Sequence, residues 1–226
     1  MGVIVPEFRN AFFPDVITGI QNILIPKGYQ VLIMQSNENA ETELSNVKTL
    51  YNNMVDGLII SFSAETQKVT YYKKLLEEKF PIIQFNRIID KLQSAKVVLD
   101  DHAWAFMPTE HLILQGYKNI VHFMGPKFLS FSLARAKGFK DAMIKHNLFV
   151  SDEQIIETEG VDMEHGKATM RKLIENKQVP EAIFAVYDPI ALGAMLVMKA
   201  NNIKIPDDVG IVGFSDSHLS EVIKPS

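Results

Sequence analysis

Short apolar runs recur along the chain at intervals of roughly 20–35 residues, and segments with helical spacing lie between them. The runs are rich in Ile and Val and do not alternate with polar residues, which is typical of strands buried on both faces of a sheet. Nine such runs cover residues 3–5, 31–34, 57–60, 81–85, 96–99, 119–124, 155–156, 182–186 and 209–212. The regular alternation predicts an α/β fold with parallel sheets and helices on both faces.

One predicted helix conflicts with its own pattern. Apolar residues and His111 recur at helical spacing through residues 104–114, but Pro108 lies inside this segment. A proline removes a backbone donor and crowds the preceding turn, so we expect it to kink or shorten the helix. His111 falls on the apolar stripe of this helix, and His146 falls on that of a later one. We therefore expect both histidines in the core or at its boundary.

The strand count also predicts the domain organisation. Nine strands exceed one small sheet, so we expect two lobes. Two strands follow each other without a helix near residues 96–101, which places the change of lobe there. The expected lobes are residues 1–100 and 101–226, and no flexible linker tract separates them.

Composition narrows the classes of function. The chain has 226 residues, of which 47% are hydrophobic and 22% charged, and this balance is typical of a globular protein. It contains no cysteine, which excludes disulfides, thiolate catalysis, Cys-ligated zinc and iron–sulfur clusters. No stretch of apolar residues is long enough to span a membrane. The net charge of −4 argues against direct binding of nucleic acid by these residues.

Polar and aromatic residues follow most of the predicted strands. In open parallel sheets, ligands bind beyond the carboxyl ends of the strands, so these residues are candidates for a binding site. The candidate segments are Pro6-Glu7-Phe8, Ser36-Asn37, Ser61-Phe62-Ser63, Asn86-Arg87, Asp100-Asp101, Gly125-Pro126, Tyr187-Asp188 and Phe214-Ser215-Asp216. Amides, carboxylates and guanidinium groups can each hold neighbouring hydroxyls, while aromatic rings cover the apolar side of a sugar or base.

Motifs for catalysis are lacking. The chain has no G-x-S-x-G, H-E-x-x-H or G-x-G-x-x-G motif, and its six histidines show no metal-ligand spacing. The segment from Gly160 to Lys167 resembles a phosphate-binding loop. However, five residues separate its glycines instead of four, and Ala168 stands where a magnesium-binding hydroxyl is required. We therefore expect no enzyme, no cofactor and no metal.

Taken together, several segments resemble the effector-binding core of the LacI/GalR family of bacterial transcription regulators. The segments fall in the order and spacing of that family and extend over essentially the whole chain. They are GVIVPEFRNAFFPDVITGI, MVDGLIIS, FPIIQFNR, KVVLDD, GYKNIVHFMGP, ARAKGF, AIFAVYDPIALGA and IPDDVGIVGFSDS. The resemblance implies a fold like the type I periplasmic binding proteins, with two Rossmann-like lobes and a small effector between them.

The resemblance also implies which residues bind the effector. These are Phe12, Phe13, Ser61, Asn86, Asp100, Arg135, Asp188 and Phe214. Phe12 and Phe13 would lie against the ligand, although one of them could serve only to fill the core. Arg135 and Asp188 would hydrogen-bond the ligand, although Asp188 could instead only cap the following helix. Tyr187 replaces a residue that is often Asn in the family, which makes the second lobe more apolar.

The resemblance finally implies a role in transcription. It predicts the effector-binding and dimerisation core of a cytoplasmic regulator that binds a sugar or a related metabolite and forms a homodimer. DNA would be bound only by an N-terminal helix-turn-helix domain outside this chain, and effector-driven lobe closure would alter operator binding. The main alternative is an extracytoplasmic sugar-binding protein of a transport system. A nucleotide-dependent enzyme would require phosphate-binding glycines after a strand, which the sequence lacks.

Overall fold

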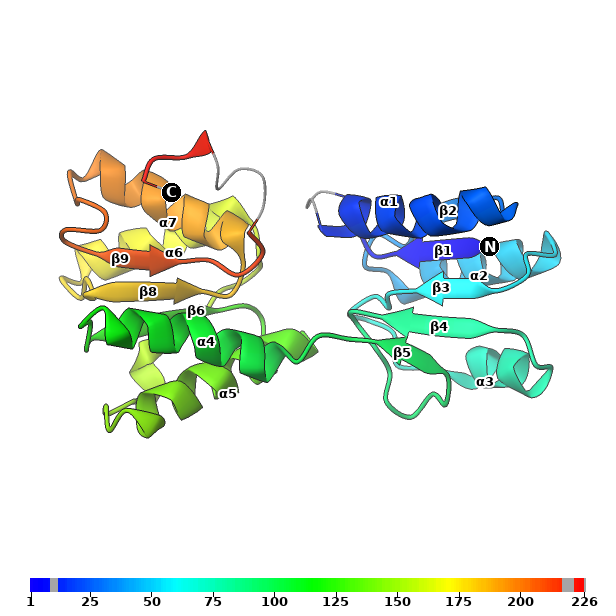
Figure 1. The fold of residues 1–226 in the computed structure, drawn as a ribbon, viewed down its shortest axis with the longest axis horizontal. Coiled ribbons are helices and arrows are strands. Elements are labelled where there is room, and N and C mark those ends of the chain that lie inside the picture. The colour runs from blue at the N-terminus through cyan, green and yellow to red at the C-terminus, as the bar shows by residue number, and fades with distance from the viewer. Residues whose placement is uncertain (9–11, 217–221, 226) are drawn as a thin grey trace. The chain divides into compact units, whose positions relative to one another are not determined.

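The computed structural model describes residues 1–8, 12–216 and 222–225, and these residues form two compact units (Figure 1). Unit 1 is Met1–Leu99, and unit 2 is Asp100–Ser226. Each unit has its own parallel sheet with helices on both faces, which confirms the predicted fold class. All nine predicted runs contain a strand, and the described residues form nine strands in total.

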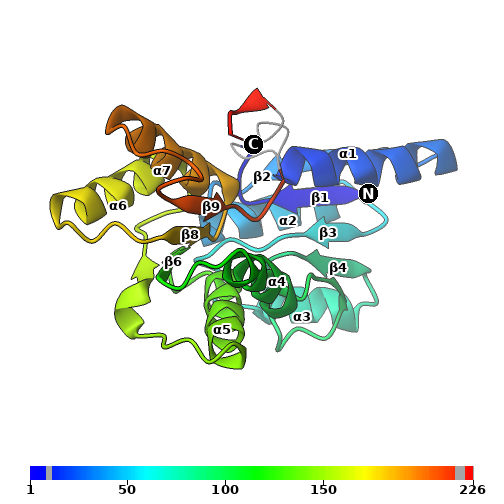
Figure 2. The ribbon, with the colours of Figure 1, turned by 60° about the vertical axis from the view of Figure 1, so that its left-hand side comes forward.

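Unit 1 has a parallel sheet in the order β2-β1-β3-β4-β5 among its described residues. Alternate residues of β1 face opposite sides, so that Val3 and Val5 pack against α1, while Ile4 packs with α2 and α3 (Figures 1 and 2). The elements are β1 (Gly2–Val5), α1 (Phe12–Leu24), η1 (Ile25–Lys27), β2 (Leu32–Gln35), α2 (Ala40–Asn52), β3 (Leu58–Ile60), α3 (Thr70–Glu77), β4 (Ile82–Phe85) and β5 (Ala95–Val97).

Unit 2 has a parallel sheet in the order β7-β6-β8-β9. Helices α4 and α5 cover the face that contains Ile120 and Phe184, and α6 and α7 cover the face that contains Val121 and Ile183 (Figure 1). The elements are α4 (Asp101–Leu114), β6 (Ile120–Met124), α5 (Ser130–Lys145), η2 (Asp152–Gln154), β7 (Ile155–Glu157), α6 (Met163–Glu175), β8 (Ala182–Ala185), α7 (Asp188–Ala200) and β9 (Gly210–Val212). None of the helices in the described part of the chain has the length and apolar character needed to cross a bilayer.

Two details of the predicted burial are wrong. Strand β5 is exposed along its whole length, and β2 is half-exposed, because both lie at edges of the sheet and only one neighbouring strand covers them. In α4, the buried residues are Ala105, Thr109 and Leu112, so the stripe that contains His111 faces solvent. Pro108 does not shorten α4, which continues to Leu114.

The core of unit 2 contains a fully buried histidine. His122 in β6 lies between the rings of Phe139 and Phe184, with centroid distances of 5.5 and 4.6 Å. Its Nδ1 donates to the Phe184 carbonyl at 2.9 Å, and its Nε2 has no hydrogen-bond partner among the described residues. Burial lowers the pKa of His122 to about 4. The imidazole is therefore neutral in the folded protein at neutral pH.

We expect this histidine to make folding sensitive to acid. Below pH 6.5 the unfolded chain binds a proton at His122, whereas the folded chain does so only near pH 4. Stability contributed by the neutral ring is therefore lost as the pH falls, by roughly 3 kcal/mol across this window. Urea titrations at several pH values should show the loss, and H122Q should reduce it. An equal loss in H122Q and wild type would contradict the assignment.

Candidate functional site

The carboxyl-terminal edge of the sheet in unit 1 carries two buried serine hydroxyls. Ser36 follows β2 and Ser61 follows β3, and their backbone amides donate to Val5 and Ile4 at 3.0 Å. Both side chains are completely buried, yet neither hydroxyl oxygen has a hydrogen-bond partner among the described residues. Buried polar groups are normally paired, so these two hydroxyls are candidates for contact with a bound polar molecule.

The residues after β4 close this edge by contacts within unit 1. Asn86 adopts a left-handed conformation with φ of 56°, and its amide donates to Val97 at 3.1 Å. Asn tolerates this conformation better than most residues because its short side chain can bond locally. The neighbouring Arg87 forms an ion pair with Glu38 at 2.5 Å. Asn86 is half-buried, and the positive charge beside it is already compensated.

The aromatic pair at the start of α1 divides into two environments. Phe13 is only 3% exposed and packs edge-to-face with Phe12 and Phe85, at centroid distances of 5.2 and 6.2 Å. Phe12 is half-buried at the first position of α1, beyond the carboxyl end of β1. Phe13 therefore contributes to the core of unit 1, and Phe12 is the more accessible ring of the two.

Arg135 of α5 is the most heavily bonded side chain at the corresponding edge of unit 2. Its Nε and Nη2 donate to Oδ1 of Asp101 at 2.9 and 2.6 Å, and its Nη1 donates to the Val186 carbonyl at 2.6 Å. The guanidinium also lies 3.2 Å from the ring centroid of Phe214 and 4.8 Å from that of Phe131. Burial lowers the pKa of Arg135, and Asp101 opposes this effect. The charge is thus both neutralised and covered.

Asp188 connects two of the loops at this edge. It is the first residue of α7, and its Oδ1 accepts hydrogen bonds from the amides of Phe214 and Ser215 at 2.9 and 3.0 Å. The side chain is 8% exposed. Gly213 stands beside it because a Cβ there would collide with the Asp188 carboxylate. Asp188 therefore fixes the loop after β9, in addition to any contact with a ligand.

Asp188 also lines a cavity of about 190 Å³ within unit 2. The cavity lies along α7 and β9, and its other walls are mainly apolar, including Leu192, Met195 and Ile211. A carboxylate beside an apolar wall suits a ligand that has both a donor and a hydrocarbon face.

The two aspartates at the start of α4 have different roles. Asp100 caps the helix, because its Oδ1 accepts from the Ala103 amide at 3.0 Å. Asp101 pairs with Arg135, as described above. Sequence reasoning selected Asp100 as the ligand-binding residue of this pair and missed the contact of Asp101, which its position next to Asp100 alone could not reveal.

The sequence of residues 1–222 matches the family described as "Periplasmic binding proteins and sugar binding domain of LacI family". This match covers almost the whole chain. The chain belongs to this family. Membership of the LacI family confirms the resemblance found in the sequence and agrees with the two parallel-sheet units described above.

Two sequence relatives and one solved structure illustrate the similarity. Catabolite control protein A of Priestia megaterium is 28% identical over 226 residues, which are 100% of this chain and 67% of that protein. The ribose operon repressor of Halalkalibacterium halodurans is also 28% identical over 226 residues, 100% of this chain and 65% of that protein. The crystal structure of transcription regulator CcpA of Lactococcus lactis matches with a TM-score of 0.86 and 23% identity, over 99% of this chain and 81% of that chain, which supports the fold.

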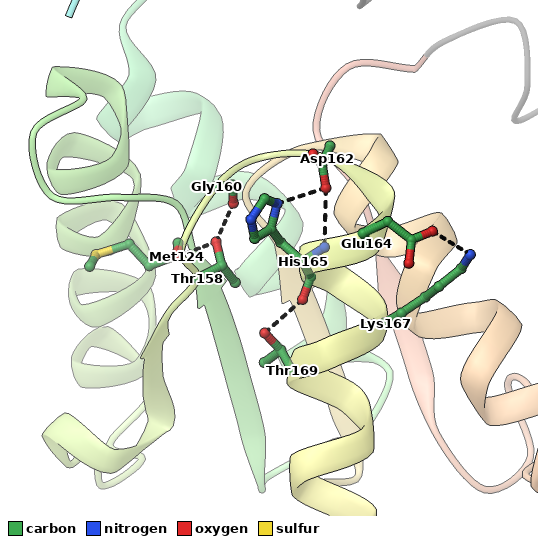
Figure 3. A network of polar contacts seen from close by, with 8 residues as sticks. All are labelled: Met124, Thr158, Gly160, Asp162, Glu164, His165, Lys167 and Thr169. Atoms are coloured by element: carbon green, nitrogen blue, oxygen red, sulfur yellow. Dashed lines mark hydrogen bonds and ion pairs between the residues drawn. The ribbon is translucent and has the colours of Figure 1, made fainter.

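The segment that resembled a phosphate loop has another role in this LacI-family chain. Asp162 caps α6, and its Oδ1 accepts from both the amide and the Nδ1 of His165 at 3.1 and 2.7 Å (Figure 3). The His165 ring lies over Gly160, where a Cβ would come within 2.5 Å of it. Thr158 donates to the carbonyl of Gly160 at 2.6 Å. Side chains thus occupy the space beside this turn.

Proposed function

We propose that this chain is the effector-binding and dimerisation core of a DNA-binding transcription regulator, which acts in the cytoplasm and catalyses no reaction. LacI-family membership supports this proposal, as do the names of the two sequence relatives, a control protein and an operon repressor. The chain spans about two thirds of the length of these relatives. In this proposal, DNA is bound by a separate N-terminal domain, as the family resemblance implies. Because the relatives are named as regulators, the alternative of a transport protein is not favoured.

The observation that carries the proposal is the buried, unpartnered hydroxyl of Ser61 at the edge where parallel sheets bind ligands. A fully buried hydroxyl without a hydrogen-bond partner lowers the stability of the protein unless a ligand supplies that hydrogen bond. The corresponding edge of unit 2 contains the Asp188 carboxylate and the guanidinium of Arg135. Three N–H groups of this guanidinium donate to Asp101 and Val186, which leaves two for a ligand. The proposed ligand-binding residues are Phe12, Phe13, Ser61, Asn86, Asp100, Arg135, Asp188 and Phe214.

The charges at these edges favour an uncharged effector. Arg135 is neutralised by Asp101, Arg87 by Glu38 and Lys127 by Glu157, each within its own unit. A phosphate or carboxylate at this edge of unit 2 would also have to approach the carboxylate of Asp188. A sugar instead presents hydroxyls that donate to carboxylates and accept from guanidinium groups, and a carbon face that suits aromatic rings. We therefore propose an unphosphorylated sugar or polyol.

The proposed response to the effector follows from the thermodynamic coupling between effector binding and the orientation of the units. An effector that contacts both units would favour one orientation of the units, and only its difference in affinity between orientations can shift the equilibrium. In the intact regulator, that shift would change how two DNA-binding domains fit an operator.

A homodimer is proposed as the assembled form. In unit 1, the edge strand β2 exposes Leu32 and Ile33, and the end of α1 and the turn after it expose Ile23 and Ile25. Exposed edge strands and apolar patches are usually covered by a partner in native proteins. A second copy of the chain would cover this surface.

A thermal-shift screen tests the effector class. The panel should contain D-ribose, D-glucose, their phosphates, disaccharides, polyols and nucleobases. We expect at least one uncharged sugar or polyol to stabilise the protein, by roughly 2.7 kcal/mol at 100 times its dissociation constant, and its phosphorylated form to have little effect. Stabilisation only by phosphorylated compounds would contradict the effector class, and the absence of any shift across the panel would contradict the proposed function.

A pair of variants controls this screen. In isothermal titration, D188A should bind the uncharged compound with much lower affinity than the wild type, because the substitution removes the carboxylate and loosens the loop after β9. D152A removes a carboxylate whose side chain is 96% exposed and pairs with Lys140 on the surface. Its affinity should equal that of the wild type.

A further inference from the structure

Unit 1 contains a buried carboxylate that has no part in the proposed function described so far. Glu43 of α2 is completely buried. Its oxygens accept hydrogen bonds from the Ser63 amide at 2.6 Å, the Tyr72 hydroxyl at 2.6 Å and the Thr66 hydroxyl at 2.8 Å. These three donors compensate the charge in a site that excludes solvent.

The donors belong to the segment between β3 and α3 and to α3 itself. That segment begins at Ser61, whose unpartnered hydroxyl is a proposed ligand contact. Glu38 holds the next amide of the same segment, because its Oε2 accepts from Ala64 at 3.0 Å. Phe62 is 2% exposed and packs edge-to-face on Tyr72 at a centroid distance of 5.1 Å. Two carboxylates and one aromatic pair therefore hold residues 62–64 directly after Ser61.

Stability alone is a poor reason to bury Glu43. A buried ion costs several kcal/mol in desolvation, and well-packed apolar residues often serve as well or better for stability. A carboxylate does what an apolar residue cannot, because it accepts from a backbone amide and two hydroxyls at fixed positions. The group is thus suited to setting the path of the loop.

We propose that Glu43 is a positioning residue for the effector site, which fixes the segment from Ser61 to Thr66 in its binding conformation through Ser63, Thr66 and Tyr72. The proposal rests on the proposed function, since Ser61 is assigned to the effector there. Glu43 acts through the loop and touches no effector itself. The segment would otherwise have to be ordered on binding, which costs affinity.

The acid dependence of binding gives a specific readout. Burial raises the pKa of Glu43, and the hydrogen bond from Tyr72 opposes this rise. The titratable groups that face Glu43 are Tyr72 from α3 and Glu38 from the segment before α2, and Glu38 also raises the pKa. Protonation would weaken the acceptor for Ser63, so affinity should fall as the pH is lowered. Removing the Tyr72 hydroxyl should move that fall to higher pH.

The test compares two tyrosine-to-phenylalanine changes. Y72F removes the donor to Glu43, and Y51F removes an equivalent Tyr–Glu hydrogen bond of 2.8 Å from Tyr51 to Glu78 on the surface of the same unit. Hydrogen exchange at Ser63 and Ala64 should accelerate about tenfold in Y72F and remain unchanged in Y51F. Titration with D-ribose and D-glucose across pH 4 to 8 should show an affinity about tenfold lower in Y72F, with the acid midpoint at higher pH.

The outcomes separate the two proposals. E43Q keeps the size of the side chain and should bind the sugar weakly with a flatter pH profile, which a purely structural role would not produce. Unchanged exchange at Ser63 and unchanged affinity in folded Y72F would overturn the role of Glu43. Wild-type protein that binds neither these two sugars nor any uncharged compound of the thermal-shift panel would count against the effector class, and exchange at Ser63 would then still decide whether Glu43 fixes the loop.

Discussion

D101A should lose about 3–5 kcal/mol of unfolding free energy, because it leaves the charge of Arg135 buried without its partner. Arg135 is 6% exposed, and the rings of Phe131 and Phe214 lie against its guanidinium. Water therefore cannot replace the lost carboxylate without opening the edge of unit 2. Urea denaturation followed by the fluorescence of Trp104, the only tryptophan of the chain, reports on this unit.

Asp100 provides the matched control, since it is the same residue type one position earlier. D100A removes only the cap on the Ala103 amide, so its loss should be about 1 kcal/mol. The double variant D101A/R135M removes both charges and should recover most of the stability lost in D101A. Equal small losses in D100A and D101A would show that the pair contributes little to folding.

This result would also change the interpretation of Arg135. The sequence alone suggests that R135A abolishes effector binding with little loss of folding, because family resemblance places the residue at a ligand site. The structure shows three hydrogen bonds from the guanidinium to Asp101 and Val186. Loss of binding in R135A must therefore be compared with loss of fold, and the same comparison is required for D188A, whose carboxylate accepts from the Phe214 and Ser215 amides.

Much of the fold could be predicted from the sequence because central parallel strands have a strong signature. Residues 120–124 and 182–185 are buried on both faces, so their sequences are continuously apolar apart from His122. The same rule failed at the run of residues 96–99, where three apolar residues follow Lys96 and are exposed, because burial at the edge strand β5 depends on what lies beside it. In α4 the spacing of apolar residues predicted the wrong face as buried, since Thr109 is buried while Trp104 is exposed.

The connections of the candidate site could not be predicted in the same way. Post-strand positions and family resemblance select Ser61 and Asp188, and their ligand-binding roles remain predictions. The pair of Arg135 with Asp101 spans 34 residues, and that of Tyr72 with Glu43 spans 29. Such contacts depend on how helices pack on the sheet, and no local pattern in the sequence encodes them.

G193A should destabilise unit 2 by on the order of 3 kcal/mol, because α6 and α7 pack too closely for a side chain at this position. A Cβ on Gly193 would lie 2.8 Å from the Lys167 amide nitrogen and would collide with the Met163 carbonyl oxygen. Both obstacles are backbone atoms, so they cannot move aside as a flexible side chain would.

Each of the two helices has a glycine at the point where it approaches the other, so a local shift of the backbone could hardly remove the collision. Gly166 of α6 faces α7 in the same way, and a Cβ there would collide with the Ile190 carbonyl. The helices would have to separate, and since α7 begins at Asp188, the loop that this residue holds would move with them. G193A should therefore weaken effector binding as well as stability.

Gly19 in the middle of α1 is the control for the same substitution. Apart from the neighbouring backbone of α1 itself, no atom of the described residues lies within 4 Å of a Cβ built there, and alanine favours a helix over glycine by about 1 kcal/mol. G19A should raise the urea midpoint while G193A lowers it. A G193A protein with wild-type stability would mean that α6 and α7 can separate without cost, and the tight layer over the sheet of unit 2 could not then be what holds the Asp188 loop in place.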